Sequence, residues 1–306
     1  GANTTGAENA AFGSNALSAS VGADKNTALG AYALRNDTEG ESSVAVGHQA
    51  LNAQNFSSAT SAYNVAVGAN AGVSVTTGVS NNLIGGLAGD ALTDADFNVA
   101  LGYTALSNDT LGSGSTAIGH GTLSLQNFTS ATTTYNTAVG FKAGNVLTTA
   151  TNNTLIGSLS GDAITTGINN TAVGYNSLSS LTEGDNNVAL GGDSLFSNTV
   201  GDKNVAVGRS ALLNFNPASN ADTYNTAVGH EAGKSVTTGT QNTLIGGQSG
   251  DALTSGGDNT ALGYASLGAG IASFYNTAIG TFALVSDTTG RHNVAVGRRA
   301  LNSQNL

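Results

Sequence analysis

The sequence predicts an all-β fold, an elongated parallel β-solenoid (β-roll) whose stacked coils carry the same residue types at the same place. Variants of the pentad Asn-(Thr/Val)-Ala-(Val/Ile/Leu)-Gly recur seventeen times, and thirteen of the sixteen intervals between their glycines have the same length, seventeen residues. The other three, Gly47 to Gly68, Gly119 to Gly140 and Gly208 to Gly229, are longer by four. A 17-residue unit is too short for a helical repeat and is typical of one solenoid coil, so about 17 coils are expected.

The pentad is the expected strand of each coil. The residue before its glycine is always apolar, and the residue two places earlier is Thr or Val in fifteen coils. These strand formers share a face, because side chains alternate along a strand, and we expect that face to line the coil interior. Ala lies between them in fourteen coils, and Leu83, Leu155 and Leu244 replace it in three. The small residue is therefore expected on the opposite, outer face.

The rest of each coil is expected to turn and return. A second glycine follows the first by ten positions in nine of the thirteen uninterrupted coils, which suggests two tight bends and a flattened coil with two short strands. Stacking at about 4.8 Å per coil would give a rod on the order of 80 Å long. The recurring Asn at the start of the pentad predicts a ladder that satisfies buried polar groups.

The three longer coils carry loops at 52–63, 124–135 and 213–224, aligned on Asn55-Phe56, Asn127-Phe128 and Asn214-Phe215. Their aromatic residues either contact a receptor or fold back onto the coil. The last residues, 300–306, repeat the opening of such a loop at 50–56. We therefore expect residues 1–306 to be a single repeat solenoid within a longer chain. The candidate receptor contacts are Phe56, Tyr63, Phe128, Tyr135, Phe215 and Tyr224.

A thin coil has little core, so the sequence also predicts association between chains. An aligned stripe of Ala on an outer strand face would allow close approach of a neighbour, although Ala could instead fill a narrow roll. The interface alanines predicted on this basis are Ala28, Ala45, Ala66, Ala100, Ala117, Ala138, Ala172, Ala189, Ala206, Ala227, Ala261, Ala278 and Ala295.

Pentads such as Asn204-Val205-Ala206-Val207-Gly208, followed by Ala211-Leu212, resemble the head repeats of YadA-like trimeric autotransporter adhesins and the similar repeats of phage tail fibres. The resemblance covers essentially the whole chain. It implies an intertwined or side-by-side homotrimer of parallel β-rolls, with Val205 and Val207 facing each roll's own core and Ala206 facing the neighbouring chains. Adhesin-head repeats are typically shorter than the 17-residue unit found here. The inserted loops are additional to the adhesin pattern, and the coiled-coil stalk and membrane anchor of such adhesins are not found among these residues.

Composition restricts the chemistry. Only 9% of residues are charged, the net charge is −10 and the few cations form no run, which argues against nucleic-acid binding. No stretch is long and apolar enough to span a membrane, and no cysteine is present. No catalytic residue, metal ligand or cofactor is predicted. Asp90, Asp162 and Asp251 each follow a glycine and are interpreted as turn residues.

The expected function is that of the shaft or head of an extracellular fibre, on a cell surface or a virion, that attaches to a surface glycan or protein receptor. His48, His120, Arg209 and Arg298 share a coil position and could bind an anion or acidic glycan if three chains came together. One alternative is an ice-binding solenoid, but the pentad Thr interchanges with Val and an ice plane needs continuity. A fibre-borne glycan hydrolase is a weaker alternative, because it needs two carboxylates in a cleft.

Overall fold

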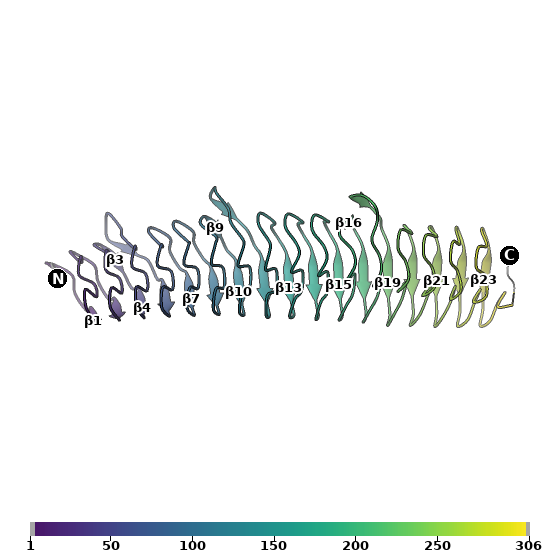
Figure 1. Cartoon of the computed structure of the whole chain (residues 1–306), viewed down its shortest axis with the longest axis horizontal. Helices are drawn as coiled ribbons and strands as arrows, with labels where there is room; N and C mark the ends of the chain where they lie inside the picture. The colour runs from purple at the N-terminus through teal and green to yellow at the C-terminus, as the bar shows by residue number, and fades with distance from the viewer. Residues whose placement is uncertain (1–3, 304–306) are drawn as a thin grey trace. The chain divides into compact units, whose positions relative to one another are not determined.

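The computed structural model describes residues 4–303, which form two compact units divided between Asn152 and Asn153. Each unit is a parallel β-solenoid without helices in its described residues, and the two contain eight and nine main strands, one per turn. The predicted fold class and repeat of about 17 turns are confirmed. The strands of each unit lie side by side in Figure 1.

The first unit stacks eight three-residue strands in register. They are β1 (Ala10–Phe12), β2 (Thr27–Leu29), β4 (Val44–Val46), β6 (Val65–Val67), β7 (Asn82–Ile84), β8 (Val99–Leu101), β10 (Thr116–Ile118) and β12 (Thr137–Val139). Each pairs in parallel with the next, so that Ala28 lies beside Ala45 and Ala100 beside Ala117.

The second unit repeats this arrangement with nine strands. They are β13 (Thr154–Ile156), β14 (Thr171–Val173), β15 (Val188–Leu190), β17 (Val205–Val207), β19 (Thr226–Val228), β20 (Thr243–Ile245), β21 (Thr260–Leu262), β22 (Thr277–Ile279) and β23 (Val294–Val296). The long coil does not break the register, because Ala206 still pairs with Ala227 on the far side of the insertion.

The expectation of two strands in every coil is wrong. The return side of a coil consists of turns that hydrogen-bond to the next coil, as where the Leu34 amide donates to the carbonyl of Ala50 at 3.0 Å. Within residues 4–303, second strands occur only where a long coil pairs with the coil before it, as the two-residue pairs β3 (Gly40–Glu41) with β5 (Thr60–Ser61), β9 (Gly112–Ser113) with β11 (Thr132–Thr133), and β16 (Gly201–Asp202) with β18 (Ala221–Asp222). The inserted loops project beyond the neighbouring turns in Figure 1.

The assignment of the two strand faces is also wrong. The middle Ala of each predicted interface strand is buried inside its own chain, whereas most flanking residues are half-buried or exposed on the outer face. The interior already holds a layer of buried Leu side chains such as Leu34 and Leu51, so the facing strand has room for little more than a methyl group. The residues that the structure buries, contrary to the interface prediction, are Ala28, Ala45, Ala66, Ala100, Ala117, Ala138, Ala172, Ala189, Ala206, Ala227, Ala261, Ala278 and Ala295.

Coils with a larger strand residue compensate on the opposite wall. Leu83 replaces the strand Ala, and the facing positions of its own and the preceding coil are Gly89 and Gly72, where eleven other coils have Leu. A Cβ on Gly72 would lie 2.6 Å from Leu83 Cδ1, and one on Gly89 would lie 2.7 Å from Leu83 Cδ2. A larger side chain on the strand is therefore matched by smaller residues on the opposite wall, and the interior stays filled.

Asparagine side chains connect successive coils, as predicted, but through the backbone and not only through amide-to-amide contacts. The Asn64 Oδ1 accepts a hydrogen bond from the Asn81 amide at 2.9 Å, and its Nδ2 donates to the carbonyl of Gly78 at 2.7 Å. The second unit repeats the pattern, with the Asn187 amide donating to Asn170 Oδ1 at 2.9 Å. The buried Asn64 amide thus satisfies two backbone groups of the next coil that would otherwise lack partners.

The pentad glycine is required by the stacking itself. Gly30 has a φ of +139°, and a Cβ there would fall on the carbonyl oxygen of Gly47 in the next coil. The second glycine of the coil, such as Gly78, lies outside the left-handed region, so its role is close approach and not a special φ. The left-handed bends are instead formed largely by other residues, including Leu34 with a φ of +47°.

We predict that Leu83→Ala lowers the free energy of unfolding by about 2–5 kcal/mol, because it empties a closed interior. The triple variant Leu83→Ala/Gly72→Leu/Gly89→Leu should recover much of that loss, since leucine adopts the same backbone at Leu51 and Leu106, with φ of +49° and +55°. Urea unfolding followed by circular dichroism measures both. A triple variant no more stable than the single one would contradict the exchange of size between walls.

Candidate functional site

The outer face of the strands is the first candidate for contact. In the first unit it exposes Phe12, Leu29, Ile84 and Leu101, one from each of four strands. In the second unit it exposes Ile156, Ile245, Leu262 and Val296. Each is the residue directly before the pentad glycine, so apolar side chains form a column along the sheet. The sequence pattern assigns the residues of this column to the coil interior, and that prediction is wrong.

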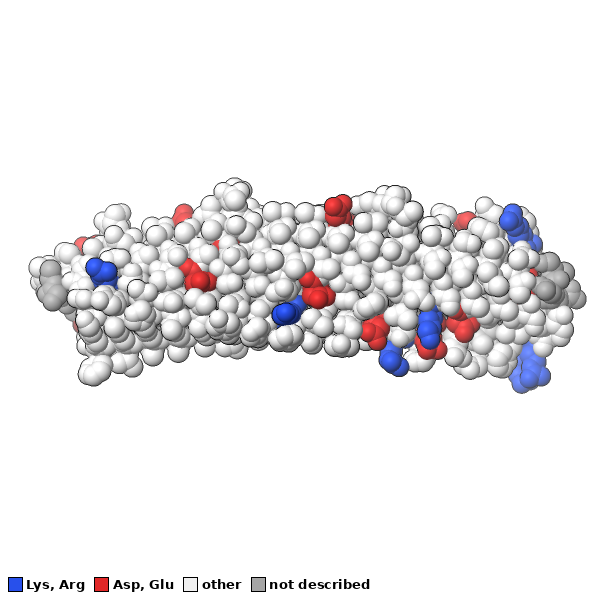
Figure 2. Space-filling model, viewed as in Figure 1, with Lys and Arg blue, Asp and Glu red and all other residues white. Residues whose placement is uncertain are grey.

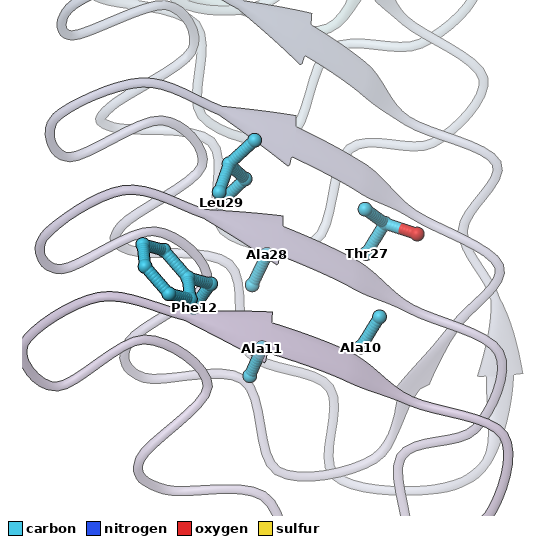
Figure 3. A pocket seen from close by; sticks show the side chains of 6 residues that line it. All are labelled: Ala10, Ala11, Phe12, Thr27, Ala28 and Leu29. Atoms are coloured by element: carbon cyan, nitrogen blue, oxygen red, sulfur yellow. The ribbon is translucent and has the colours of Figure 1, made fainter.

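Figure 3 shows this face at β1 and β2. Phe12 and Leu29 lie on neighbouring strands at one end, Ala10 and Thr27 lie at the other, and Ala11 and Ala28 lie between them. These residues line a hollow of about 270 Å³ whose surface is mainly carbon. The lining of the hollow suits an apolar protein side chain better than a polar ligand, because it offers few hydrogen-bonding groups.

The loop aromatics divide into buried and exposed residues. Phe56, Phe128 and Phe215 are buried, so the structure does not place them as receptor contacts. Tyr63, Tyr135 and Tyr224 are exposed and remain candidates. Folding back onto the coil, the alternative that the sequence left open, applies to the phenylalanines alone.

The alignment of the third loop on Phe215 is wrong by two residues. The Phe215 amide donates to the Leu212 carbonyl at 3.2 Å, as the Gln54 amide does to Leu51 at 3.2 Å. Phe215 therefore occupies the place of Gln54 and Gln126 in the interior. Pro217 follows at the position of Phe56 and Phe128. The shared dipeptide Asn-Phe led to the wrong alignment. The third loop has two more residues after its phenylalanine than the first two loops have.

Gln54 belongs to a buried polar cluster beneath the first loop. Its Nε2 donates to Asp37 Oδ2 at 2.8 Å and to Ser43 Oγ at 3.1 Å, and its Oε1 accepts from Asn64 Nδ2 at 2.9 Å. Burial raises the pKa of the Asp37 carboxyl, although hydrogen bonds from Gln54 and the Gly40 amide oppose the shift. Every member has a partner within the cluster, so its role is to hold the loop on the coil.

The residues proposed to bind an anion are exposed but occupy separate surroundings. His48 packs edge-on against Tyr32 at 6.0 Å between ring centroids. His120 lies between Tyr103 and Phe141, at 5.6 and 5.4 Å. Arg209 and Arg298 lie in the second unit and are exposed. The structure does not bring these four residues together within one chain, so an anion site there would need further chains.

Charged side chains are sparse on the surface. The face shown in Figure 2 carries Lys, Arg, Asp and Glu singly or in small mixed groups among uncharged residues. One such pair joins Lys203 Nζ to Asp222 Oδ2 at 2.6 Å, and the Tyr224 hydroxyl also donates to this carboxylate at 2.9 Å. Within residues 4–303 no group of three or more His, Cys, Asp or Glu side chains could hold a metal ion. No helix in that range is long and apolar enough to cross a membrane.

Two of the turn carboxylates have a perturbed pKa. Burial raises the pKa of Asp90 and of Asp251, whereas hydrogen bonds from nearby backbone amides act in the opposite direction. Among the described residues, Asp90 Oδ1 is buried without a hydrogen-bond partner, as is the amide oxygen of Asn70 in the preceding coil. Asn145, at the same coil position as Asp90, donates to the Gly121 carbonyl at 2.9 Å and to Ser124 Oγ at 2.6 Å.

Comparison with family models, with curated proteins and with solved structures finds no match to this chain. The function of the chain is therefore inferred from its fold, its surface and its repeated residues.

We predict that Asp90→Asn raises the free energy of unfolding at pH 7 by about 0.5–1.5 kcal/mol, because the new amide can donate where the carboxylate only accepts. The raised pKa means that the native protein binds this proton more tightly than the unfolded chain. Stability from this group is therefore greatest at low pH and declines as pH rises from the ordinary value of 3.8 through the raised one. In the variant that part of the pH dependence should disappear.

Urea unfolding at intervals from about pH 3.5 to about pH 7.5 measures the effect. Asp258→Asn is the matched control, because it removes the same charge from an exposed site. An Asp90→Asn variant with the pH dependence of the parent chain would contradict the role given to burial.

Proposed function

We propose that this chain is a structural segment of an extracellular fibre in which copies associate along their outer strand faces and attach to a surface or host receptor. The observation that carries the proposal is the exposed apolar column in each unit, represented by Leu101 and Leu262. A continuous apolar column is unusual on the surface of a monomer and is typical of an interface. A second copy of the chain is the partner that presents a column with the same repeat.

Three copies are the proposed number, and this rests on the resemblance of pentads such as Asn204-Val205-Ala206-Val207-Gly208 to YadA-like adhesin heads and phage tail-fibre repeats. The interface differs from the one that the resemblance implied. Val205 and Val207, which flank Ala206 within strand β17, are now the proposed contacts, because Ala206 is buried within its own chain. A parallel arrangement would place equivalent residues of each copy at the same level.

The display of side chains on loops supports attachment. The long coils expose Tyr63, Tyr135 and Tyr224 on a backbone whose register is fixed by its neighbours. Rigid aromatic side chains contribute large contact areas at low entropic cost, which is why they are common in recognition sites. The proposed role is binding, on a cell surface or a virion, with the solenoid as the spacer that carries the loops.

We predict that Leu101→Glu reduces the oligomer to a single chain, because a carboxylate buried in an apolar contact costs several kcal/mol. Leu101 is 42% exposed in the single chain. The control is Leu125→Glu, which makes the same change at a residue 46% exposed that lies in a turn and not in the column. Native mass spectrometry should show trimers for the parent chain and the control. A parent chain that is monomeric at micromolar concentration would overturn the proposed assembly.

Ice binding remains a second candidate, favoured by one observation. Thr226, Thr243, Thr260 and Thr277 lie in register on four successive strands of the second unit, and the face they share is the outer one. The neighbouring column there contains Val228, Ile245, Leu262 and Ile279, which favours contact with protein.

Thermal hysteresis decides between these candidates. We expect none from the parent chain, because Val188 and Val205 interrupt the threonine column. Clear hysteresis that is lost in Thr243→Val would establish ice binding in place of the fibre proposal.

A further inference from the structure

A cleft of about 440 Å³ lies beside the second long coil. Its lining residues come from three successive coils and are Asp96, Phe97, Ser113, Gly114, Thr133 and Tyr135. Of these, only Tyr135 was a candidate from the sequence. Phe97 and Tyr135 are 64% and 66% exposed, which leaves both rings accessible to a ligand.

The cleft results from a missing side chain. Phe97, Gly114 and Tyr135 occupy the same place in three stacked coils, directly before the ladder position. Strand spacing separates the two aromatic residues by about 9.5 Å, with Gly114 between them. A Cβ at Gly114 would lie 3.6 Å from Thr133 Cγ2 and 3.8 Å from Tyr135 Cδ1. The glycine therefore forms the floor, and the rings form the two walls.

The other two long coils provide a comparison within the same chain. Beside the first, Ser42 takes the place of Gly114, and Lys25 takes the place of Phe97. Beside the third, the corresponding residues are Lys203 and Asn186. There Lys203 fills the space, since its Nζ lies 3.3 Å from the Tyr224 hydroxyl and 5.3 Å from the centre of the ring. The middle coil alone combines two aromatic walls with an open floor.

The polar groups of the cleft can bind hydroxyls. Asp96 Oδ1 accepts a hydrogen bond from the Val79 amide at 2.7 Å, and a carboxylate can accept several more. Ser113 Oγ accepts from the Asp96 amide at 2.9 Å, which leaves its own hydroxyl proton to donate. Thr133 is exposed and adds a second hydroxyl. These groups lie beside Gly114 in the lining of the cleft.

We propose that this cleft binds a neutral pyranose ring, held between Phe97 and Tyr135 and hydrogen-bonded to Asp96, Ser113 and Thr133. Two van der Waals contacts of about 3.5–4.0 Å account for most of the space between the walls, so one ring fits. The apolar faces of a sugar pack on aromatic rings, and its hydroxyl groups can meet the polar side chains of the lining. Asp96 and the net charge of −10 disfavour an acidic sugar. The inference rests on the proposed attachment function and assigns its ligand class.

Gly114→Lys tests the cleft with little risk to the fold. Lys203 and Ser42 adopt the same left-handed backbone at the equivalent place, with φ of +58° and +60° against +76° for Gly114. The added side chain should occupy the cleft as Lys203 does in the third coil. The matched control is Ser42→Lys, which introduces the same residue beside the first loop, where no second aromatic wall is present.

Binding is measured by saturation-transfer NMR and calorimetry with methyl glycosides of glucose, galactose, mannose, N-acetylglucosamine and N-acetylgalactosamine, and with their tri- and tetrasaccharides. We expect at least one of these series to bind the parent chain and Ser42→Lys equally, and Gly114→Lys at least tenfold more weakly. Phe97→Ala and Tyr135→Ala should each weaken binding, since each removes one wall.

Three outcomes would overturn the inference: no binding of any neutral sugar by the parent chain, unchanged binding by Gly114→Lys, or binding of choline in place of sugars at the same residues. Native mass spectrometry and adhesion to intact cells, measured on the same samples, distinguish failure of the fibre proposal from failure of the sugar-binding proposal. Sugar binding without assembly or adhesion would contradict the fibre function alone. Assembly and adhesion that persist in Gly114→Lys, with no sugar bound by the parent chain, would contradict the cleft alone.

Discussion

In-register stacking of identical coils is the constraint on which the rest of each unit depends. The pentad glycines bring successive backbones so close that a Cβ at Gly30 would meet the carbonyl oxygen of Gly47. The asparagine ladder then joins most coils to the next through both oxygen and nitrogen of its amides, as at Asn64 and Asn81. Because these contacts reach only the adjacent coil, stability in such folds is approximately a sum of coil and neighbour terms. The positions of the outer strand face and of the inserted loops both depend on this spacing between coils.

The sequence predicted this framework well because it repeats. Period and strand position are encoded in every coil and the ladder asparagine in fifteen of the seventeen, so the repeated pattern reinforces one interpretation. Alternation along the strand correctly grouped Val205 with Val207 against Ala206, but it could not say which group faces inward. That choice depends on the opposite wall, where Leu34, Leu51 and their equivalents already fill the coil. The pairing of Leu83 with Gly72 and Gly89 was the signal in the sequence that could have decided it.

The candidate binding surface was predicted less well, because it depends on residues that do not repeat. Phe215 follows an asparagine, as Phe56 and Phe128 do, but is displaced by two positions in the coil. The cleft joins Phe97, Gly114 and Tyr135, which are separated by one normal and one long repeat and share no motif. All three lie five residues before a pentad glycine, so the signal in the sequence is a glycine between two aromatic residues at one coil position.

The unbroken register across the long coils has a further consequence for how such a chain can diversify. Four additional residues emerge at one bend, yet Ala45 still pairs with Ala66 and Ala117 with Ala138. The bend therefore behaves as a graft site, where segments of different length and composition can be exchanged while the hydrogen bonds between strands stay as they are. The floor position in the coil before each loop already differs, with Ser42, Gly114 and Lys203. New binding specificities could arise there by point changes, independently of the selection that maintains the stack.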